Sequence, residues 1–562
     1  MAKMSGGHAL MRCLVEEGVD TIFGYPGGAI MPVYNALYDF RDQINHILVR
    51  HEQAAAHAAE GYARMSGKPG VCIATSGPGA TNLVTGIADA MMDSIPLVCI
   101  TGQVSSAVLG TDAFQETDVI GVTIPITKWN YQITDASEIP EIMAKAFYIA
   151  RSGRPGPVLV DITKNAQIES VDFNYQRRED LQSYSPKYVP EISDLDAAAT
   201  LINQAERPLL LVGHGVLISK AEERLLKFVE KSGIPVACTL HGLSAFPTRH
   251  PLYAGMLGMH GNYGPNVLSN QADLVIACGM RFDDRVTGDL GSYLKKAKVI
   301  HIEIDPAEIH KNVRADVAIV ADAGNALAEL LPRVEKRTHP EWIEKFQECA
   351  RIEFEKIIGP GTQPSDDKLR MIEVIHQLSE RSKGDAVVVA NVGQHQMMSA
   401  RYYRFNTPDS WVTSGGLGTM GFALPAAIGC KFAVPNRQVV AVIGDGCFQM
   451  TLQELATIAQ EDLPVKIMVL NNNFLGMVRQ WQELFFDNRY SFVNLKNPNF
   501  VKVVEGFGIQ AEKVSTRAEL GAAIDRMLAA PKAYFLEVVV EMEENVFPMV
   551  PTGTSVSDIR LE

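Results

Sequence analysis

The sequence predicts an α/β protein made of three doubly wound parallel-sheet domains, and three observations support this prediction. Short runs of apolar, β-branched residues recur along the chain, and each ends in a Gly-rich turn or a polar loop. Segments with apolar residues at helical spacing lie between these runs. Two polar, Pro-containing stretches divide the chain, which gives predicted domains at 1–165, 190–332 and 369–541.

The first predicted domain begins with an amphipathic helix pattern near Ala9. The Ala-rich segment at 51–67 is expected to form a second helix. Four strands are predicted: one in TIFGYPGGAI (21–30) before a Gly-rich turn at Gly27-Gly28, one in VCIATSGPGATN (71–82) before a Gly-rich loop, and the runs IPLVCITGQV (95–104) and GPVLVDI (156–162). A linker is predicted from 165 to about 192, because this stretch is polar and contains Pro186 and Pro190.

The second and third domains repeat this alternation. Four strands are predicted in the second domain, at 208–216, 235–240, 273–280 and 299–305, and four in the third, at 386–394, 439–446, 465–473 and 533–541. The charged segment 333–368 is predicted to connect the two domains. The loop at 414–419 resembles the loop at 76–81, which favours two related outer domains.

Bulk composition excludes several classes of function. The formal net charge is −14 and no dense Lys/Arg block stands out, so neither nucleic acid nor a membrane surface is an expected partner. No window approaches the ~18 apolar residues of a membrane span, and the N-terminus has no signal-peptide core. The eight cysteines form no CxxC pair, which favours buried free thiols in a reducing cytosol. We therefore expect a cytoplasmic protein.

Polar residues at two strand ends in the third domain indicate a metal site. Asp445 follows one apolar run and Asn472 follows the next. Because the carboxyl ends of parallel strands share one edge of a sheet, these side chains are expected to lie close together. A carboxylate and an amide oxygen suit Mg²⁺, and the glycines beside Asp445 let backbone N–H groups approach a diphosphate. The alternative is an ordinary Gly-Asp-Gly turn and an ordinary Asn-rich loop.

The spacing of these residues favours the metal site. A stretch of 24 residues, 447–470, separates GDG from NNN. This arrangement resembles the signature of thiamine diphosphate enzymes, in which the Asp, the second Asn and a carbonyl two residues later hold the metal. The corresponding metal ligands here are Asp445, Asn472 and Phe474.

Glu52, within RHEQAAAHAAEGYA, has two interpretations. It is either a solvated carboxylate in the first turn of a helix, favoured there by the helix dipole, or a carboxyl in an apolar cleft that exchanges a proton with a cofactor nitrogen. Thiamine diphosphate chemistry requires a group of the second kind.

Nearly the whole chain resembles the catalytic large subunits of the acetohydroxyacid synthase (acetolactate synthase) family. The matching stretches include FGYPGGAIMPVY, RHEQAAAHAAEGYAR, TSGPGATN, GTDAFQETD, GMRFDDRVTG, TSGGLGTMGFALPAA and LGMVRQWQ. Their combination is far more specific than any one of them. The resemblance implies a biosynthetic enzyme with thiamine diphosphate, Mg²⁺ and FAD as cofactors.

The resemblance also implies roles for individual residues. Glu52 is the cofactor-activating acid, and Gly28 is a backbone donor at the reacting carbonyl. The diphosphate contacts are Gln394, His395, Gly446 and Cys447. The pyrimidine is held by Gly418 and by Met420, which bends the cofactor. The substrate channel is lined by Phe114, Gln115 and Lys164.

Three residues are expected at the substrates. Arg285, in RFDDR, is implied to bind the carboxylate of the second ketoacid; the alternative is a surface ion pair with a neighbouring Asp. Trp481 is implied to favour 2-oxobutanoate over pyruvate; the alternative is a core tryptophan at helical spacing with Met477. Met259, in GMLGMHG, is expected at the same site.

The second domain is implied to bind FAD in a structural role. The positions that match the family's flavin site are Arg154, Gly213, Gly215, Thr239, His260, Gly279, Arg281, Asp305 and Asp322. The RFDDR segment separates FAD-containing biosynthetic enzymes from FAD-free catabolic ones. The sequence departs from the family pattern at His214, Asn391 and Cys447, and at Thr163 and Asn165 on either side of Lys164.

The implied reaction decarboxylates pyruvate and joins the remaining fragment to a second 2-oxoacid, pyruvate or 2-oxobutanoate. Its products feed branched-chain amino acid synthesis. The family implies a homodimer or homotetramer in which Glu52 of one subunit serves the cofactor of its partner, and a separate regulatory small subunit. The alternatives are a pyruvate oxidase, an FAD-free catabolic acetolactate synthase and a non-catalytic protein on the same fold.

Overall fold

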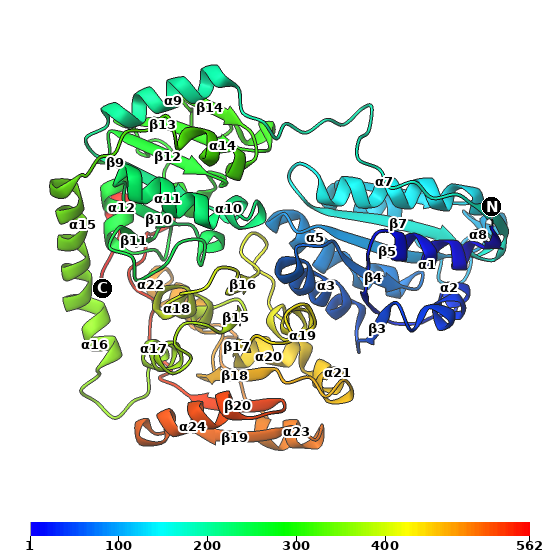
Figure 1. Ribbon diagram of the computed structural model, residues 1–562. Coiled ribbons are helices and arrows are strands. Elements are labelled where there is room, and N and C mark those ends of the chain that lie inside the picture. Colours follow the sequence, from blue (N-terminus) through cyan, green and yellow to red (C-terminus); the bar gives the residue numbers. More distant parts are fainter. Residues whose placement is uncertain (1) are drawn as a thin grey trace.

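The computed structural model describes residues 2–562 (Figure 1). Within this range the strands form three six-stranded sheets and one two-stranded sheet. Helices lie against each large sheet, and the three layered units occupy separate parts of the molecule, in blue to cyan, in green, and in yellow to red (Figure 1). The prediction of three doubly wound α/β domains is confirmed.

The N-terminal sheet is parallel throughout, in the order β3-β2-β4-β5-β7-β6. Its strands are β2 (Thr21–Gly24), β3 (Asn45–Leu48), β4 (Gly70–Ala74), β5 (Leu97–Gln103), β6 (Trp129–Ile133) and β7 (Pro157–Thr163). The helices are α1 (Gly6–Glu16), α2 (Met31–Leu37), α3 (Glu52–Ser66), α4 (Pro78–Asn82), α5 (Val84–Asp93), α6 (Val119–Thr123), α7 (Ile139–Arg151) and α8 (Lys164–Ile168). A short antiparallel pair, β1 (Ala2–Ser5) with β8 (Ser170–Phe173), lies beside this sheet.

The middle sheet is also parallel, in the order β11-β10-β9-β12-β13-β14. Its strands are β9 (Pro208–Val212), β10 (Val236–Cys238), β11 (Tyr253–Met256), β12 (Leu274–Cys278), β13 (Lys298–Glu303) and β14 (Val317–Val320). The helices are α9 (Ile192–Gln204), α10 (His214–Ile218), α11 (Glu222–Ser232), α12 (Tyr263–Ser269), α13 (Asp284–Thr287) and α14 (Ala323–Leu330). Counted along the chain, the strand order is 3-2-1-4-5-6, the order of dinucleotide-binding sheets.

The C-terminal sheet runs β16-β15-β17-β18-β20-β19, again parallel. Its strands are β15 (Val387–Ala390), β16 (Trp411–Thr413), β17 (Val439–Gly444), β18 (Lys466–Asn471), β19 (Gln510–Val514) and β20 (Tyr534–Val539). The helices are α17 (Met371–Arg381), α18 (Gln394–Tyr402), α19 (Ala423–Ala433), α20 (Asp445–Thr451), α21 (Leu455–Gln460), α22 (Gly476–Phe485), α23 (Phe500–Gly506) and α24 (Arg517–Ala529). Counted along the chain, this order and that of the N-terminal sheet are both 2-1-3-4-6-5, in keeping with the expected relation of the outer domains.

The sequence prediction missed β1 and β8 of the two-stranded sheet and six strands of the large sheets. All six are edge strands of the large sheets: β3, β6, β11, β14, β16 and β19. Most of them are only partly buried, as in β6 and β19, so their residues do not form the continuous apolar run that marks a central strand. β16 is buried but only three residues long. The predicted connector 333–368 also contains helices, namely α15 (Pro340–Glu353), the π-helix Phe354–Ile358 and α16 (Gly359–Thr362).

The N-terminal and C-terminal domains meet through α3 and α19, which are both rich in small residues. A Cβ on Gly61 of α3 would lie 2.1 Å from the carbonyl oxygen of Ala426, and one on Gly429 of α19 would lie 1.8 Å from that of Ala58. Glycine is therefore required at both crossing points, because the two backbones touch. This contact fixes the N-terminal domain on the C-terminal one.

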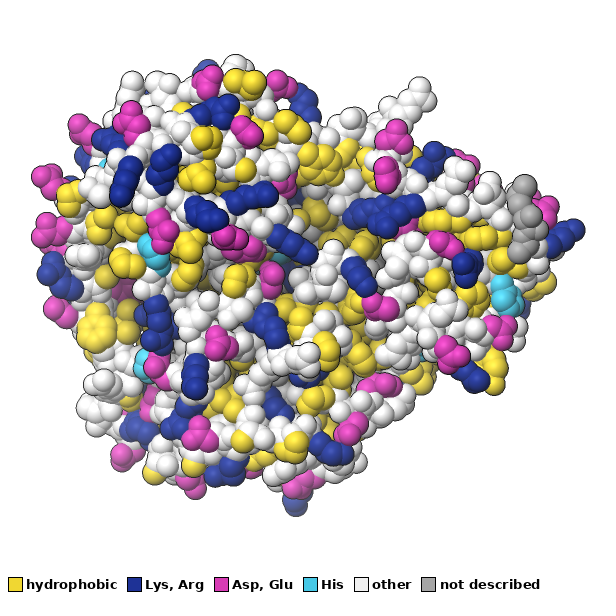
Figure 2. Space-filling view, in the orientation of Figure 1, with side chains coloured by type: hydrophobic (Ala, Val, Ile, Leu, Met, Phe, Trp, Pro, Cys, Tyr) yellow, Lys and Arg dark blue, Asp and Glu magenta, His cyan; other side chains and the backbone are white. Residues whose placement is uncertain are grey.

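Other predictions concern the interior and the surface. All eight cysteines are buried and free, as predicted. No helix within residues 2–562 has the length and apolar character needed to cross a bilayer. On the face in Figure 2, basic and acidic side chains are interspersed.

Candidate active site

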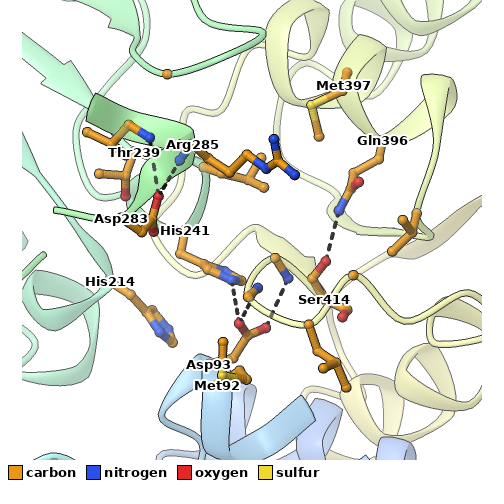
Figure 3. Close-up of a pocket in the computed structure, with 18 of the residues that line it drawn as sticks. Met92, Asp93, His214, Thr239, His241, Asp283, Arg285, Gln396, Met397 and Ser414 are labelled. Carbon is orange, nitrogen blue, oxygen red and sulfur yellow. Dashed lines mark hydrogen bonds and ion pairs between the residues drawn. The ribbon is translucent and has the colours of Figure 1, made fainter. Parts of the chain in front are cut away.

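One large cavity, of about 950 Å³, lies mainly between the middle and C-terminal domains, and residues of the N-terminal domain such as Asp93 and Arg154 also line it. Its walls are formed largely by residues that follow β9 and β12 in the middle sheet and β15, β17 and β18 in the C-terminal sheet. All five are carboxyl ends of parallel strands, where α/β folds bind ligands. Part of this cavity is shown in Figure 3.

The C-terminal wall of the cavity centres on the point where the strand order reverses, between β15 and β17. Gln394 and His395 begin the helix after β15, and Asp445, Gly446 and Cys447 begin the helix after β17. All five line the cavity. The fold therefore gathers the four predicted diphosphate contacts and one predicted metal ligand at one place.

The three predicted metal ligands, Asp445, Asn472 and Phe474, all line this part of the cavity. Asn497 Nδ2 donates to Asp445 Oδ2 at 2.7 Å, and the Gly446 amide donates to Asp445 Oδ1 at 3.0 Å. Both partners are neutral, and burial raises the pKa of Asp445 to about 6. A carboxylate destabilised by burial, beside amide and carbonyl oxygens, suits a hard divalent cation.

His395 offers a free ring nitrogen to the same region. Its Nε2 is buried and has no hydrogen-bond partner within the described chain. Burial lowers the pKa of His395 to about 3, so the ring is neutral. Only glycine at position 444 leaves room for this ring, because a Cβ there would lie 2.8 Å from Nδ1 of His395. An unpaired buried nitrogen is costly and indicates a missing polar partner, such as a phosphate oxygen.

The Gly-rich loop at 414–420 forms another wall, with both predicted pyrimidine contacts, Gly418 and Met420, lining the cavity. Gly418 has a φ of +73°, which favours glycine, and the nearest atom to a Cβ built there would be 3.9 Å away. Its missing side chain therefore leaves open space in the cavity.

The middle-domain wall has the geometry of a dinucleotide site. The strand order reverses between β9 and β12, and Gly213, Gly215 and Gly279 follow these two strands. A Cβ on Gly215 would lie 2.7 Å from Cα of Gly279, so the two turns pack backbone to backbone. His214, one of the positions that depart from the family pattern, lies at the cavity with its ring stacked on that of His241 at 5.7 Å (Figure 3).

Most of the predicted flavin residues line this half of the cavity: Arg154, Gly215, Thr239, His260, Gly279, Arg281 and Asp322. Two do not. Gly213 is packed against Gly279, whose carbonyl oxygen would lie 2.3 Å from a Cβ there. Asp305 pairs with Arg154 at 3.4 Å.

The three predicted substrate residues, Arg285, Trp481 and Met259, all line the cavity. Arg285 approaches Asp284 only to 3.8 Å, with both side chains largely exposed, so the alternative ion pair is weak. Its Nη1 lies 3.6 Å from Met259 Sδ. Trp481 is half-buried on the cavity wall rather than in the core, with its ring 5.4 Å from that of Phe485.

The five predicted catalytic residues, Glu52, Gly28, Phe114, Gln115 and Lys164, are not among the lining residues of this cavity. They instead follow strands β3, β2, β5 and β7, at the carboxyl edge of their own sheet. Phe114 is 88% exposed. One chain therefore holds two half-sites, one at the cavity and one at the N-terminal sheet.

Glu52 is the first residue of α3, where His51 caps the helix by accepting from the Gln53 amide at 3.2 Å. Asn82 Nδ2 donates to the Glu52 carboxylate at 2.9 Å. Glycines bring the neighbouring loops close: a Cβ on Gly79 would lie 3.2 Å from Glu52 Oε1, and one on Gly77 would lie 2.9 Å from the Gln115 carbonyl. The N-terminal half-site is thus a compact group around Gly77–Gly79.

Comparison with known proteins gives the family. Three family models match the chain: the N-terminal TPP binding domain of thiamine pyrophosphate enzymes at 4–122, their central domain at 195–330 and their C-terminal TPP binding domain at 391–538. Thiamine pyrophosphate is another name for thiamine diphosphate. The acetolactate synthase large subunit of Corynebacterium glutamicum is 47% identical over 99% of this chain and 90% of that protein. The chain belongs to the acetolactate synthase family.

Other members of the acetolactate synthase family are similarly close. The isozyme 2 large subunit of Escherichia coli is 46% identical over 99% of both chains. The probable large subunit of Methanocaldococcus jannaschii is 46% identical over 99% of this chain and 95% of that protein. The resemblance predicted from the sequence is confirmed.

The structure of this acetolactate synthase family member also reveals residues that the sequence did not indicate. Asn497 donates to Asp445, Asn471 and Asn473 at 2.7, 3.0 and 3.2 Å, and so holds two strand ends together. Gln480, fully buried, accepts from Gln394 Nε2 at 3.1 Å. Gln480 lies within the matching stretch LGMVRQWQ, which by itself assigns this residue no role, and Asn497 lies in none of the matching stretches, so their contacts identify both.

Proposed function

We propose that this protein has acetolactate synthase activity: it decarboxylates pyruvate and joins the remaining fragment to pyruvate or 2-oxobutanoate. The products are 2-acetolactate and 2-aceto-2-hydroxybutanoate, precursors of branched-chain amino acids. The observation that carries the proposal is the similarity to acetolactate synthase large subunits over 99% of the chain. The same similarity disfavours a pyruvate oxidase or an FAD-free catabolic synthase.

Mg²⁺ and thiamine diphosphate are proposed to bind at the C-terminal half of the cavity. The Asp445 carboxylate, the Asn472 amide oxygen and the Phe474 carbonyl would hold Mg²⁺, whose charge would bind the diphosphate oxygens. The diphosphate oxygens would meet Gln394, His395, Gly446 and Cys447, and the pyrimidine would meet Gly418 and Met420. When bound, thiamine diphosphate supplies a nucleophilic carbon and an electron sink. The unpaired Nε2 of His395 supports this placement.

Glu52 is proposed to exchange a proton with the cofactor's pyrimidine ring, from the partner subunit of a homodimer or homotetramer. The support is geometric, since Glu52 does not line the cavity that contains Asp445. Asn82 holds the Glu52 carboxylate in place. Gly28, Phe114, Gln115 and Lys164 would close the same site from the partner, with the Gly28 amide as a donor to the substrate carbonyl. The exposed Phe114 ring would be covered in this assembly.

FAD is proposed to bind in the middle-domain half of the cavity with a structural role, because the net reaction is not a redox reaction. The 3-2-1-4-5-6 strand order and the close Gly215–Gly279 contact at its switch point support a dinucleotide. The relatives are named large subunits, which supports a separate small subunit as a regulatory partner. A cytoplasmic location is part of this proposal.

The activity is tested with purified full-length protein, pyruvate, thiamine diphosphate, MgCl₂ and FAD. We expect acetolactate to form while the flavin spectrum stays oxidised. Bleaching of the flavin during turnover would indicate an oxidase, and the absence of acetolactate with all cofactors bound would contradict the proposal.

Acceptor choice is proposed to depend on Trp481, with Arg285 holding the acceptor's carboxylate and Met259 beside it. Replacing Trp481 with leucine should enlarge the pocket and reduce the preference for 2-oxobutanoate over pyruvate by about tenfold or more, because one methylene in an apolar pocket is worth about 1–3 kcal/mol. The measurement is the product ratio at equal concentrations of both acceptors. Phe486→Leu, at the exposed end of the same helix, is the control and should leave the ratio unchanged. An unchanged ratio in Trp481→Leu would remove Trp481 from the specificity site.

Cation binding is expected to depend on pH through Asp445. Burial raises the pKa of Asp445 to about 6, so the protonated carboxyl stabilises the folded state below about pH 4. This stabilisation is lost as the pH rises through 6, because the buried carboxyl must then ionise. A bound cation offsets that loss, because it needs the ionised form. The rise in thermal midpoint on adding Mg²⁺ and thiamine diphosphate should therefore be larger at about pH 7.5 than at about pH 5. Asp445→Asn should abolish this difference, and an equal rise at both pH values in the wild type would contradict the assignment.

A further inference from the structure

The carboxylate of Asp93, at the end of α5, is fully buried where all three domains meet (Figure 3). Arg64 of α3 donates to it at 2.8 Å, and His241 of the middle domain has Nε2 at 2.9 Å from it. The amides of Gly416 and Gly415 of the C-terminal domain donate at 2.7 and 3.1 Å. Three hydrogen bonds and the ion pair with His241 therefore surround the carboxylate.

A second aspartate extends this contact along α5. Asp89, one helical turn earlier, accepts from Ser414 Oγ at 2.6 Å. Ser414 Oγ in turn accepts from the Thr419 amide at 2.8 Å. We call Asp89 and Asp93 the aspartate clamp. The clamp binds the three consecutive residues Ser414, Gly415 and Gly416. Through the Ser414 hydroxyl it is also linked to Thr419, at the far end of the same loop.

The loop accepts this clamp only because it contains glycine. A Cβ on Gly416 would lie 2.7 Å from Asp93 Oδ1, and one on Gly415 would lie 2.2 Å from His241 Nε2. A side chain on Gly416 would push the loop away from α5, and one on Gly415 would push it away from His241. Burial favours the neutral form of Asp93, but His241, Arg64 and the Gly415 amide outweigh it and hold the pKa of Asp93 below its usual value. Asp93 is therefore charged in the folded protein.

We propose that the aspartate clamp is a positioning device that sets the affinity of the cavity for thiamine diphosphate by fixing the Ser414–Met420 loop. This inference rests on the proposed function, because Gly418 and Met420 of that loop are the expected pyrimidine contacts. Neither Asp89 nor Asp93 contacts the cofactor in this proposal. They prevent the loop from moving, so that ligand binding does not have to order it.

The test compares two buried serines at opposite ends of β16. Ser414→Ala removes the hydroxyl bound to Asp89 and leaves every ion pair of Asp93 intact. Ser410→Ala is the matched control. It removes a fully buried hydroxyl, at the start of β16, that accepts a hydrogen bond from Arg437 at 2.5 Å. Asp93→Asn tests the other member of the clamp directly. Gly416→Ala provides a further variant that keeps the carboxylate, in case Asp93→Asn does not fold.

The quantities measured are the dissociation constant for thiamine diphosphate at saturating MgCl₂, the thermal midpoint of the cofactor-free protein, and kcat at saturating cofactor. Ser414→Ala and Gly416→Ala should raise the dissociation constant about tenfold or more, while kcat at saturation stays within about threefold of wild type. Ser414→Ala and Ser410→Ala should lower the thermal midpoint by similar amounts, but Ser410→Ala should leave the dissociation constant unchanged.

Equal dissociation constants for Ser414→Ala and Ser410→Ala would overturn the inference, and so would a wild-type dissociation constant in Gly416→Ala. If wild-type protein itself binds no thiamine diphosphate, the proposed function fails instead, so the two failures are distinguishable.

Discussion

Replacing Glu52 with glutamine is expected to lower kcat by about a hundredfold or more while leaving thiamine diphosphate affinity close to wild type. General acid–base groups typically contribute about 10²–10⁴-fold to rate, and glutamine keeps the size of Glu52 without its exchangeable proton. The measurements are steady-state acetolactate formation and the cofactor dissociation constant. Glu16→Gln, which removes one member of an exposed ion pair with Arg12 in α1, should retain full activity.

The Glu52→Gln variant also tests whether each active site is built from two subunits. If Glu52 serves the partner's cofactor, a mixture of Glu52→Gln and Asp445→Ala chains, each inactive alone, regains one complete site in every mixed dimer. Random reassociation of equal amounts should then give about a quarter of wild-type activity. No recovery after verified subunit exchange would place Glu52 and Asp445 in the same chain's site. Full activity of Glu52→Gln would contradict the chemistry itself.

Replacing Asp445 with alanine is expected to weaken Mg²⁺ binding by at least about a hundredfold and to abolish thiamine diphosphate retention. Residues that only orient a metal ligand typically contribute about 10–100-fold, so loss of the ligand itself should cost more. The measurement is the Mg²⁺ dependence of cofactor binding. Asn497→Ala, which removes the donor to Asp445 at 2.7 Å, should show the smaller effect.

The cofactor-free Asp445→Ala protein should unfold at a temperature at least as high as wild type at about pH 7.5, because the variant removes a carboxylate whose ionised form is disfavoured by burial. A loss of cofactor binding accompanied by a lower thermal midpoint would indicate damage to the fold rather than loss of a ligand. Asp525→Ala, at an exposed ion pair with Arg381 in the same domain, is the control for both measurements.

The sequence predicted the central strands and missed the edge strands for a physical reason. A strand such as β17 is covered on both faces, so every residue from Val439 to Gly444 is buried and the run is continuously apolar. β19 packs at the edge, where only Val514 of its five residues is buried. Burial at an edge depends on neighbouring elements, which local sequence does not describe.

The residues of the candidate site likewise fall into those that the sequence could predict and those that it could not. Asp445 and Asn472 could be predicted because each follows an apolar strand, and strand ends meet at one sheet edge. Asn497, Gln480 and Asp93 could not, because their importance lies in partners far away in the chain: Asp93 contacts Gly416, 323 residues later.

By itself, the sequence determined the fold class, the family and the cofactor residues at strand ends, because these depend on short local patterns that the backbone must obey. Only the tertiary structure decided which predicted residues share a cavity. It put Asp445, Arg285 and Trp481 around one space and left Glu52 at another sheet. Such a division depends on how whole domains pack, as where α3 and α19 touch at glycines, and local sequence patterns do not describe that packing.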